Sequence, residues 1–158
     1  MMARLRYNLL ILFAGVCCMS CGSKNYVFEQ NVAINAGLWD KNKIVSITIP
    51  VDDTVQYYDL EIYLRNRNDY PYSNIYLFIT VTAPTGAMVT DTMHYILSDV
   101  HGKWTGKGFS QLWDNRFLFR KNVRFAGTGN YLFQIRQGMR ENELPGITDV
   151  GIRMVNSQ

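Results

Sequence analysis

The sequence predicts an all-β domain, a single antiparallel β-sandwich of about eight strands, with the jelly-roll as one candidate arrangement. Three observations indicate this fold class. Apolar and polar residues alternate with period two along residues 26–156, and clusters of Gly, Pro, Asn and Asp separate the alternating runs. No window shows a sustained 3.6-residue period with helix caps.

Each alternating run has one aliphatic face and one polar or aromatic face. In chain order the runs are 45–51, 57–66, 75–83, 117–119, 131–135 and 150–154. They are rich in β-branched and aromatic residues, which favour strands. Turn residues fall at 50–53, 66–71, 83–86, 102–108, 127–130 and 145–146. Residues 93–98 also fit a single helical turn.

Length and charge narrow the class of protein. A chain of 158 residues allows about one domain. The net charge of +3 depends on the N-terminus, where Arg4 and Arg6 are unopposed by acidic residues. The rest of the chain carries fourteen basic and thirteen acidic residues. This balance gives no support for a nucleic-acid-binding surface, and no nucleic-acid partner is expected.

Residues 1–20 are predicted to be a lipoprotein signal peptide. A basic segment precedes an apolar stretch that is too short to span a bilayer comfortably. All three cysteines, Cys17, Cys18 and Cys21, lie where that stretch ends. They therefore cannot form disulfide bonds that cross-link the folded domain. We expect acylation of Cys21, which follows the small residue Ser20; Cys18 and then Cys17 are the alternatives.

The expected lipids are a diacylglycerol and an N-acyl chain on Cys21, and no other cofactor is expected. Several acyl chains give stable membrane anchoring. Residues 21–25 then form a tether, and 26–158 form the β-sandwich domain. Because Gly22 is not acidic and no acidic cluster follows, we expect an outer-membrane protein that faces the periplasm.

The sequence offers no set of residues typical of an enzyme, so a non-enzymatic protein is expected. His94 lies in an alternating segment and His101 in a turn, and their spacing is not a known metal signature. No Gly-x-Ser-x-Gly elbow is present. The neighbouring acidic residues at 52–53 and 59–61 are interpreted as a solvated turn and a solvated strand face.

Aromatic residues supply the candidate contact surface. Tyr63 and Tyr76 lie opposite the aliphatic faces of their strands, where their rings could stack on a sugar or a protein. The turn from Arg65 to Asn74 and the Gly-flanked Trp104 are further candidates, because Arg, Tyr and Trp often anchor interfaces. Packing and turn stabilisation are the alternative roles. The candidate interaction residues in these segments are Tyr63, Arg65, Arg67, Tyr70, Pro71, Tyr72, Tyr76 and Trp104.

Several motifs, taken in order, resemble the gliding-motility lipoprotein GldH family of Bacteroidota. They are Arg65-Asn66 with Tyr70-Pro-Tyr-Ser-Asn-Ile-Tyr-Leu-Phe78, Asp91-Thr92, Leu97-Ser-Asp-Val-His-Gly-Lys-Trp-Thr-Gly106, Gln137-Gly-Met-Arg140, and Leu144-Pro-Gly-Ile-Thr-Asp-Val-Gly-Ile152. The resemblance extends from the signal to Arg153. It implies an outer-membrane lipoprotein that acts with other motility lipoproteins and with the type IX secretion machinery, and it implies no catalytic residues.

Two functions therefore stand as hypotheses. The first is a non-enzymatic lipoprotein that stabilises or organises partner envelope proteins for gliding motility, type IX secretion or both. The alternative is a glycan-binding envelope lipoprotein that uses surface tyrosines.

Overall fold

The computed structural model describes residues 26–157 as eleven strands and one short 3-10 helix. The predicted signal and tether, including Cys21, lie outside the described residues. The elements are β1 (Phe28–Ala33), η1 (Asn35–Gly37), β2 (Leu38–Asp40), β3 (Val45–Val51), β4 (Tyr58–Arg67), β5 (Asn74–Thr82), β6 (Met88–Ile96), β7 (Lys107–Phe109), β8 (Leu112–Val123), β9 (Gly129–Gln137), β10 (Glu143–Pro145) and β11 (Ile147–Asn156). Within this range, no helix is long and apolar enough to cross a membrane.

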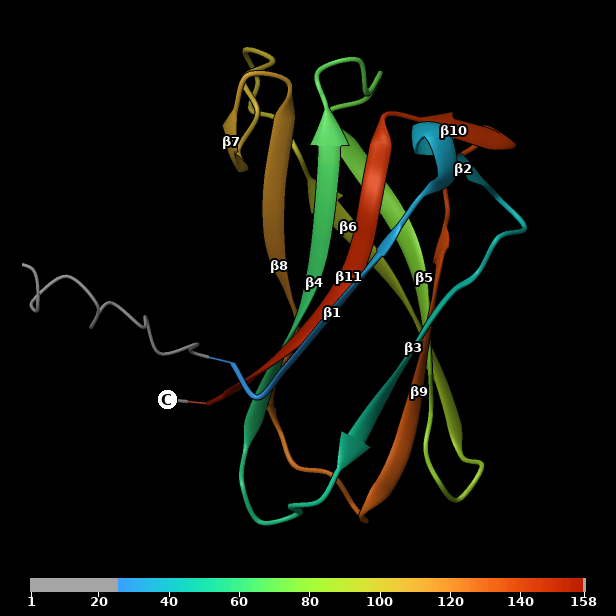
Figure 1. The fold of residues 1–158 in the computed structure, drawn as a ribbon, viewed down its shortest axis with the longest axis vertical. Helices are drawn as coiled ribbons and strands as arrows, with labels where there is room; N and C mark the ends of the chain where they lie inside the picture. The colour runs from blue at the N-terminus through green and yellow to red at the C-terminus, as the bar shows by residue number, and fades with distance from the viewer. Residues whose placement is uncertain (1–25, 158) are drawn as a thin grey trace, which may run out of the picture.

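The strands form two main antiparallel sheets that pack on one another (Figure 1). One sheet has the order β1-β11-β4-β8-β7 and the other β3-β9-β5-β6. Eight of these strands have six residues or more. Numbered along the chain, the eight follow the orders 1-8-3-6 and 2-7-4-5, which is the jelly-roll arrangement. The predicted fold class is confirmed.

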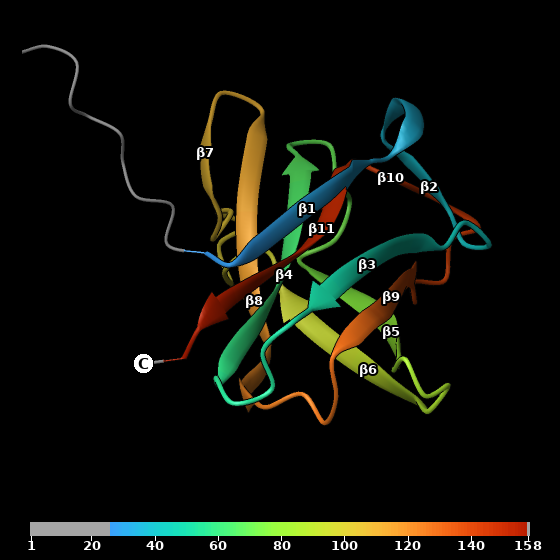
Figure 2. The same cartoon turned by 60° about the horizontal axis from the view of Figure 1, so that its bottom comes forward.

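The aliphatic faces of the strands meet between the two layers, which Figure 2 shows side by side. Burial alternates residue by residue along β3, as the period-two pattern requires. Ile47 and Ile49 of β3 are buried with Ile62 and Leu64 of β4 in one core. Burying each such side chain contributes about 1.5–3 kcal/mol, so this core is the main stabilising feature of the domain.

The short strands β2 and β10 add to the core, and the segment 93–98 differs from the sequence prediction. β2 and β10 pair with each other, and this ribbon adds Trp39 and Leu144 to the core. The helical turn expected at 93–98 is wrong, because β6 continues to Ile96 in an unbroken register with β5. His94 is thereby placed opposite Tyr76.

Most candidate residues lie at or near one end of the sandwich, the upper end in Figure 1. We call this the loop end and define it by three connections: the β4–β5 loop (68–73), the β7–β8 turn (110–111) and the β9–β10 loop (138–142). The β3–β4, β5–β6 and β8–β9 connections lie at the opposite end. The fold thus gathers segments that are far apart in the sequence.

Candidate functional site

The β4–β5 loop is held by backbone hydrogen bonds on two sides. The amide of Asn68 donates to the carbonyl of Gln111 at 3.1 Å, which links the loop to the β7–β8 turn. The amide of Arg67 donates to the carbonyl of Gly146 at 2.8 Å. Gly146 has φ of 86°, and a Cβ there would lie 2.6 Å from the Cα of Tyr70. Only glycine fits this close approach, so the loop conformation is specified by its neighbours.

Arg67 serves the structure of the loop itself. Its guanidinium donates two hydrogen bonds to Asp69, at 2.9 and 2.8 Å. It also covers Gly37, where a Cβ would lie 3.1 Å from Nη1 of Arg67. Pro71, by contrast, is exposed. Of the two predicted contact residues Arg67 and Pro71, Pro71 is therefore the one that is exposed to solvent.

Tyr63 and Arg65 lie on the outer face of β4 and share one acceptor. Asp114 of β8 accepts the Tyr63 hydroxyl at 2.5 Å and Nε of Arg65 at 2.6 Å. The hydrogen bond from Arg65 lowers the pKa of the Asp114 carboxyl, and burial raises the pKa of Tyr63. Tyr63 faces outward as predicted, yet only 5% of it is exposed. This corrects the expectation of an accessible ring at Tyr63.

Tyr70, Tyr72 and Trp104 form an aromatic cluster behind the loop. Tyr70 is buried, and its hydroxyl donates to the carbonyl of Asn74 at 2.8 Å. Its ring centroid lies 5.8 Å from that of Tyr72, edge to face, and 6.3 Å from that of Trp104. Trp104 is half-buried and packs against the core. Trp104 therefore closes part of the sandwich end and is not a freely exposed loop residue.

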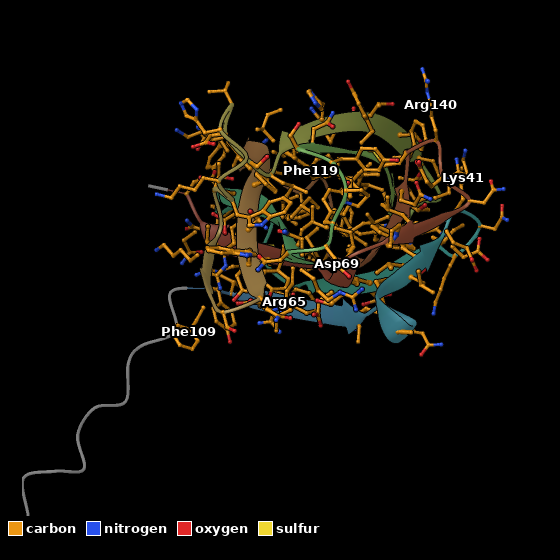
Figure 3. All side chains as sticks on the ribbon, turned by 90° about the horizontal axis from the view of Figure 1, so that it is seen from above. Lys41, Arg65, Asp69, Phe109, Phe119 and Arg140 are labelled. Carbon is orange, nitrogen blue, oxygen red and sulfur yellow. The ribbon has the colours of Figure 1, made fainter. Side chains whose placement is uncertain are left out.

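The structure brings Tyr72 and Tyr76 together in a depression of about 560 Å³. Tyr72, Asn74 and Tyr76 line one side, and the β9–β10 loop supplies the other through residues 138–141. The Tyr72 hydroxyl donates to the carboxylate of Glu141, and this hydrogen bond raises the pKa of Tyr72. Arg140 projects outward at the rim (Figure 3). We refer to this feature as the tyrosine depression.

A buried glutamine fixes the loop side of the tyrosine depression. The side-chain amide of Gln137 donates to the carbonyl of Glu141 at 2.8 Å and accepts from the amide of Met139 at 2.7 Å. Gln137 is fully buried, so both bonds are shielded from water. Sequence reasoning assigned no role to Arg140 or Glu141. The motif Gln137-Gly-Met-Arg140 was the only signal that could have pointed to them.

The two histidines have separate local contacts. His94 stacks on Tyr76 with centroids 4.5 Å apart, and its Nε2 lies 2.9 Å from Nδ2 of Asn74. His101 is exposed in a turn, and its backbone amide donates to Asp99. Across residues 26–157, no three His, Cys, Asp or Glu side chains come close enough to hold a metal ion.

Comparison with known proteins assigns the chain to a family. The family model of the GldH lipoprotein matches residues 26–154, which is nearly the whole described domain. This chain belongs to the GldH lipoprotein family. The resemblance drawn from the sequence motifs is confirmed.

Two curated GldH proteins align over almost their full lengths. The "Gliding motility lipoprotein GldH homolog" of Christiangramia forsetii is 34% identical over 155 residues, covering 94% of each chain. The "Gliding motility lipoprotein GldH" of Flavobacterium johnsoniae is 30% identical over 158 residues, covering 96% of this chain and 97% of its own. A chain from the structure of the infectious bursal disease virus Gx strain covers 83% of this chain at 10% identity, and its TM-score of 0.29 supports no inference.

Proposed function

We propose that this GldH-family lipoprotein supports gliding motility as a non-enzymatic component of the outer membrane. In this proposal Cys21 carries the lipid anchor, and the β-domain organises or stabilises partner envelope proteins, including those of the type IX secretion machinery. The observation that carries the proposal is the family match over 26–154, together with two gliding-motility relatives aligned end to end.

The loop end is the surface we assign to partner binding. Phe109, at the end of β7, is 91% exposed, and Pro71 is exposed on the neighbouring β4–β5 loop. Figure 3 shows Phe109 at the edge of this end. An exposed aromatic side chain on an internally bonded scaffold is a favourable anchor, because little conformational entropy is lost on binding.

Gene deletion tests the function. We expect loss of gliding, reduced secretion of type IX substrates and lower amounts of partner lipoproteins, all restored by the wild-type gene. Complementation with Phe109→Ser should fail to restore them. Val55→Ser is the matched control, because Val55 is 79% exposed in the β3–β4 loop at the opposite end. Unchanged gliding, secretion and partner levels in the deletion strain would refute the proposal.

The periplasmic orientation has its own test. Protease added to intact cells should leave the protein uncut, whereas protease added after the outer membrane is opened should degrade it. Digestion in intact cells would place the domain on the cell surface and contradict this part of the proposal.

A further inference from the structure

Tyr76 offers one open flank at the surface of the four-stranded sheet. On one side its ring is stacked against His94, with an interplanar angle of 12°. On the other side lies Gly138, whose amide donates to the Tyr76 carbonyl at 2.7 Å and which has no side chain to cover the ring. Tyr76 is 40% exposed. Gly138 and Tyr76 both line the tyrosine depression.

The open flank is surrounded by polar groups held in place by other residues. The side-chain amide of Asn74 is hydrogen-bonded to His94, and the carboxylate of Glu141 accepts the Tyr72 hydroxyl. The buried Gln137 holds the backbone carbonyl of Glu141. The amide of Tyr76 donates to Sδ of Met139 at 3.4 Å, which fixes the loop against the strand. A site whose polar groups are oriented before binding loses less entropy when a ligand arrives.

Arg140 is the lining residue of the tyrosine depression that can pair with an anion. Glu141 is its only lining carboxylate and already accepts the Tyr72 hydroxyl. Within residues 26–157, no carboxylate forms an ion pair with Arg140, which is exposed at the rim. Arg136, on the same sheet, lies over the ring of Phe78 at 5.4 Å and is not among the residues that line the depression.

We propose that the tyrosine depression binds an acidic saccharide, with one sugar ring stacked on Tyr76 and its anionic group paired with Arg140. A sugar has an apolar face that suits an aromatic ring and an edge of hydroxyls that suits amide and carboxylate groups. Asn74 and Glu141 supply these polar groups. This binding activity is separate from the organising role proposed above. It keeps Tyr76 of the predicted glycan surface and replaces the enclosed Tyr63 with Tyr72.

Direct binding of saccharides to the purified full-length lipoprotein tests the proposal. The probes are a hexamer of galacturonic acid and, as the neutral counterpart, cellohexaose. We expect binding of the acidic hexamer and at least tenfold weaker binding of cellohexaose. Tyr76→Ala and Arg140→Ala should each weaken acidic-hexamer binding about tenfold, the loss expected on truncating an anchor residue.

Matched variants separate stacking from general damage. Tyr76→Trp keeps a ring and should retain binding. Tyr57→Ala removes a tyrosine that is 48% exposed just before β4, at the opposite end of the sandwich, and should bind like the wild type. Circular dichroism checks that each variant is folded.

Failure of this test leaves the gliding proposal intact, because gliding and secretion are scored in cells. No binding of either hexamer, or equal binding by the wild type and folded Tyr76→Ala, would overturn the saccharide site. Equal affinity for the two hexamers would overturn the acidic class of ligand.

Discussion

The carboxylate of Asp114 holds the outward-facing Tyr63 side chain at the surface of the sheet through a hydrogen bond. It binds Tyr63 and Arg65 of β4, and Arg65 also approaches Asp149 at 3.7 Å. Three strands of the outer sheet face are thereby joined around one arginine. These groups lie partly in solvent, so the stabilisation they give is moderate.

Asp114→Asn should lower the free energy of unfolding at pH 7 by about 0.2–1 kcal/mol, because the partly exposed ion pair is lost. The folded state holds the pKa of Asp114 below its ordinary value of 3.8. The contribution of the carboxylate is therefore present above that value and is lost as the pH falls through the lower folded-state pKa. Urea unfolding at pH 7 and pH 2 should show a difference between variant and wild type that shrinks at pH 2.

The control for this measurement is Asp52→Asn, since Asp52 is exposed between β3 and β4. Its unfolding should match the wild type at both pH values. A deficit in Asp114→Asn that is as large at pH 2 as at pH 7 would contradict the electrostatic explanation.

Gln137→Ala should lower the free energy of unfolding by about 1–3 kcal/mol, because it leaves the Glu141 carbonyl and the Met139 amide without their buried partner. Gln134→Ala on the same strand, at a half-buried position, should stay within about 0.5 kcal/mol of the wild type. Urea unfolding of the two variants provides the comparison. Similar losses in both would show that Gln137 does not organise the loop.

Residue-scale features were only partly predictable. Alternation along β4 correctly predicted that Tyr63 points outward. It could not predict that the Tyr63 side chain is buried. That burial involves Asp114 of β8, which lies 51 positions further along the chain. Likewise, Tyr72 and Glu141 are 69 positions apart, so only the fold brings them into one depression.

At the scale of elements, the long strands were accessible to sequence reasoning and the short ones were not. A run such as β5 extends over nine residues, so its two faces are visible as a pattern. β2, β7 and β10 have three residues each, too few to show a period. Their pairing depends on partners elsewhere, as in the alignment of Trp39 with Leu144.

Gly146→Ala should destabilise the domain more than Gly86→Ala, by about 1–3 kcal/mol. Both glycines have φ of 86°, so the backbone strain of an alanine is the same at each. A Cβ at Gly146 would also lie 2.6 Å from the Cα of Tyr70, whereas one at Gly86 would meet nothing within 4 Å. Thermal and urea unfolding of the two variants isolate the steric contribution.

Equal destabilisation of Gly146→Ala and Gly86→Ala would contradict the close approach at Tyr70. In Gly146→Ala we also expect faster amide exchange in the β4–β5 loop, because the added methyl group pushes against that backbone. Gly86→Ala should leave exchange in this loop unchanged.

At the scale of the whole molecule, the folded domain and its anchor are expected to be separable. The chain after Cys21 contains no cysteine, so its core depends on packing and hydrogen bonds alone. Cys21→Ala should abolish labelling by a fatty-acid probe and release the protein from the membrane fraction. Circular dichroism of the released protein should still show a β-rich domain.

Cys18→Ala and Cys17→Ala are the matched controls, and both should keep the label and the membrane location. Label that persists in Cys21→Ala but disappears in one of these variants would identify that cysteine as the acylated residue and contradict the assignment of Cys21.

The place of β11 in the jelly-roll has a consequence for the timing of folding. This strand lies between β1 and β4, and among the described strands β1 pairs with β11 alone. β1 therefore has no strand partner until residues 147–156 are available, although it is the first of the described strands to be synthesised. We therefore expect the closing of this sheet edge to be a late step of folding, whatever the order in which the other strands pair.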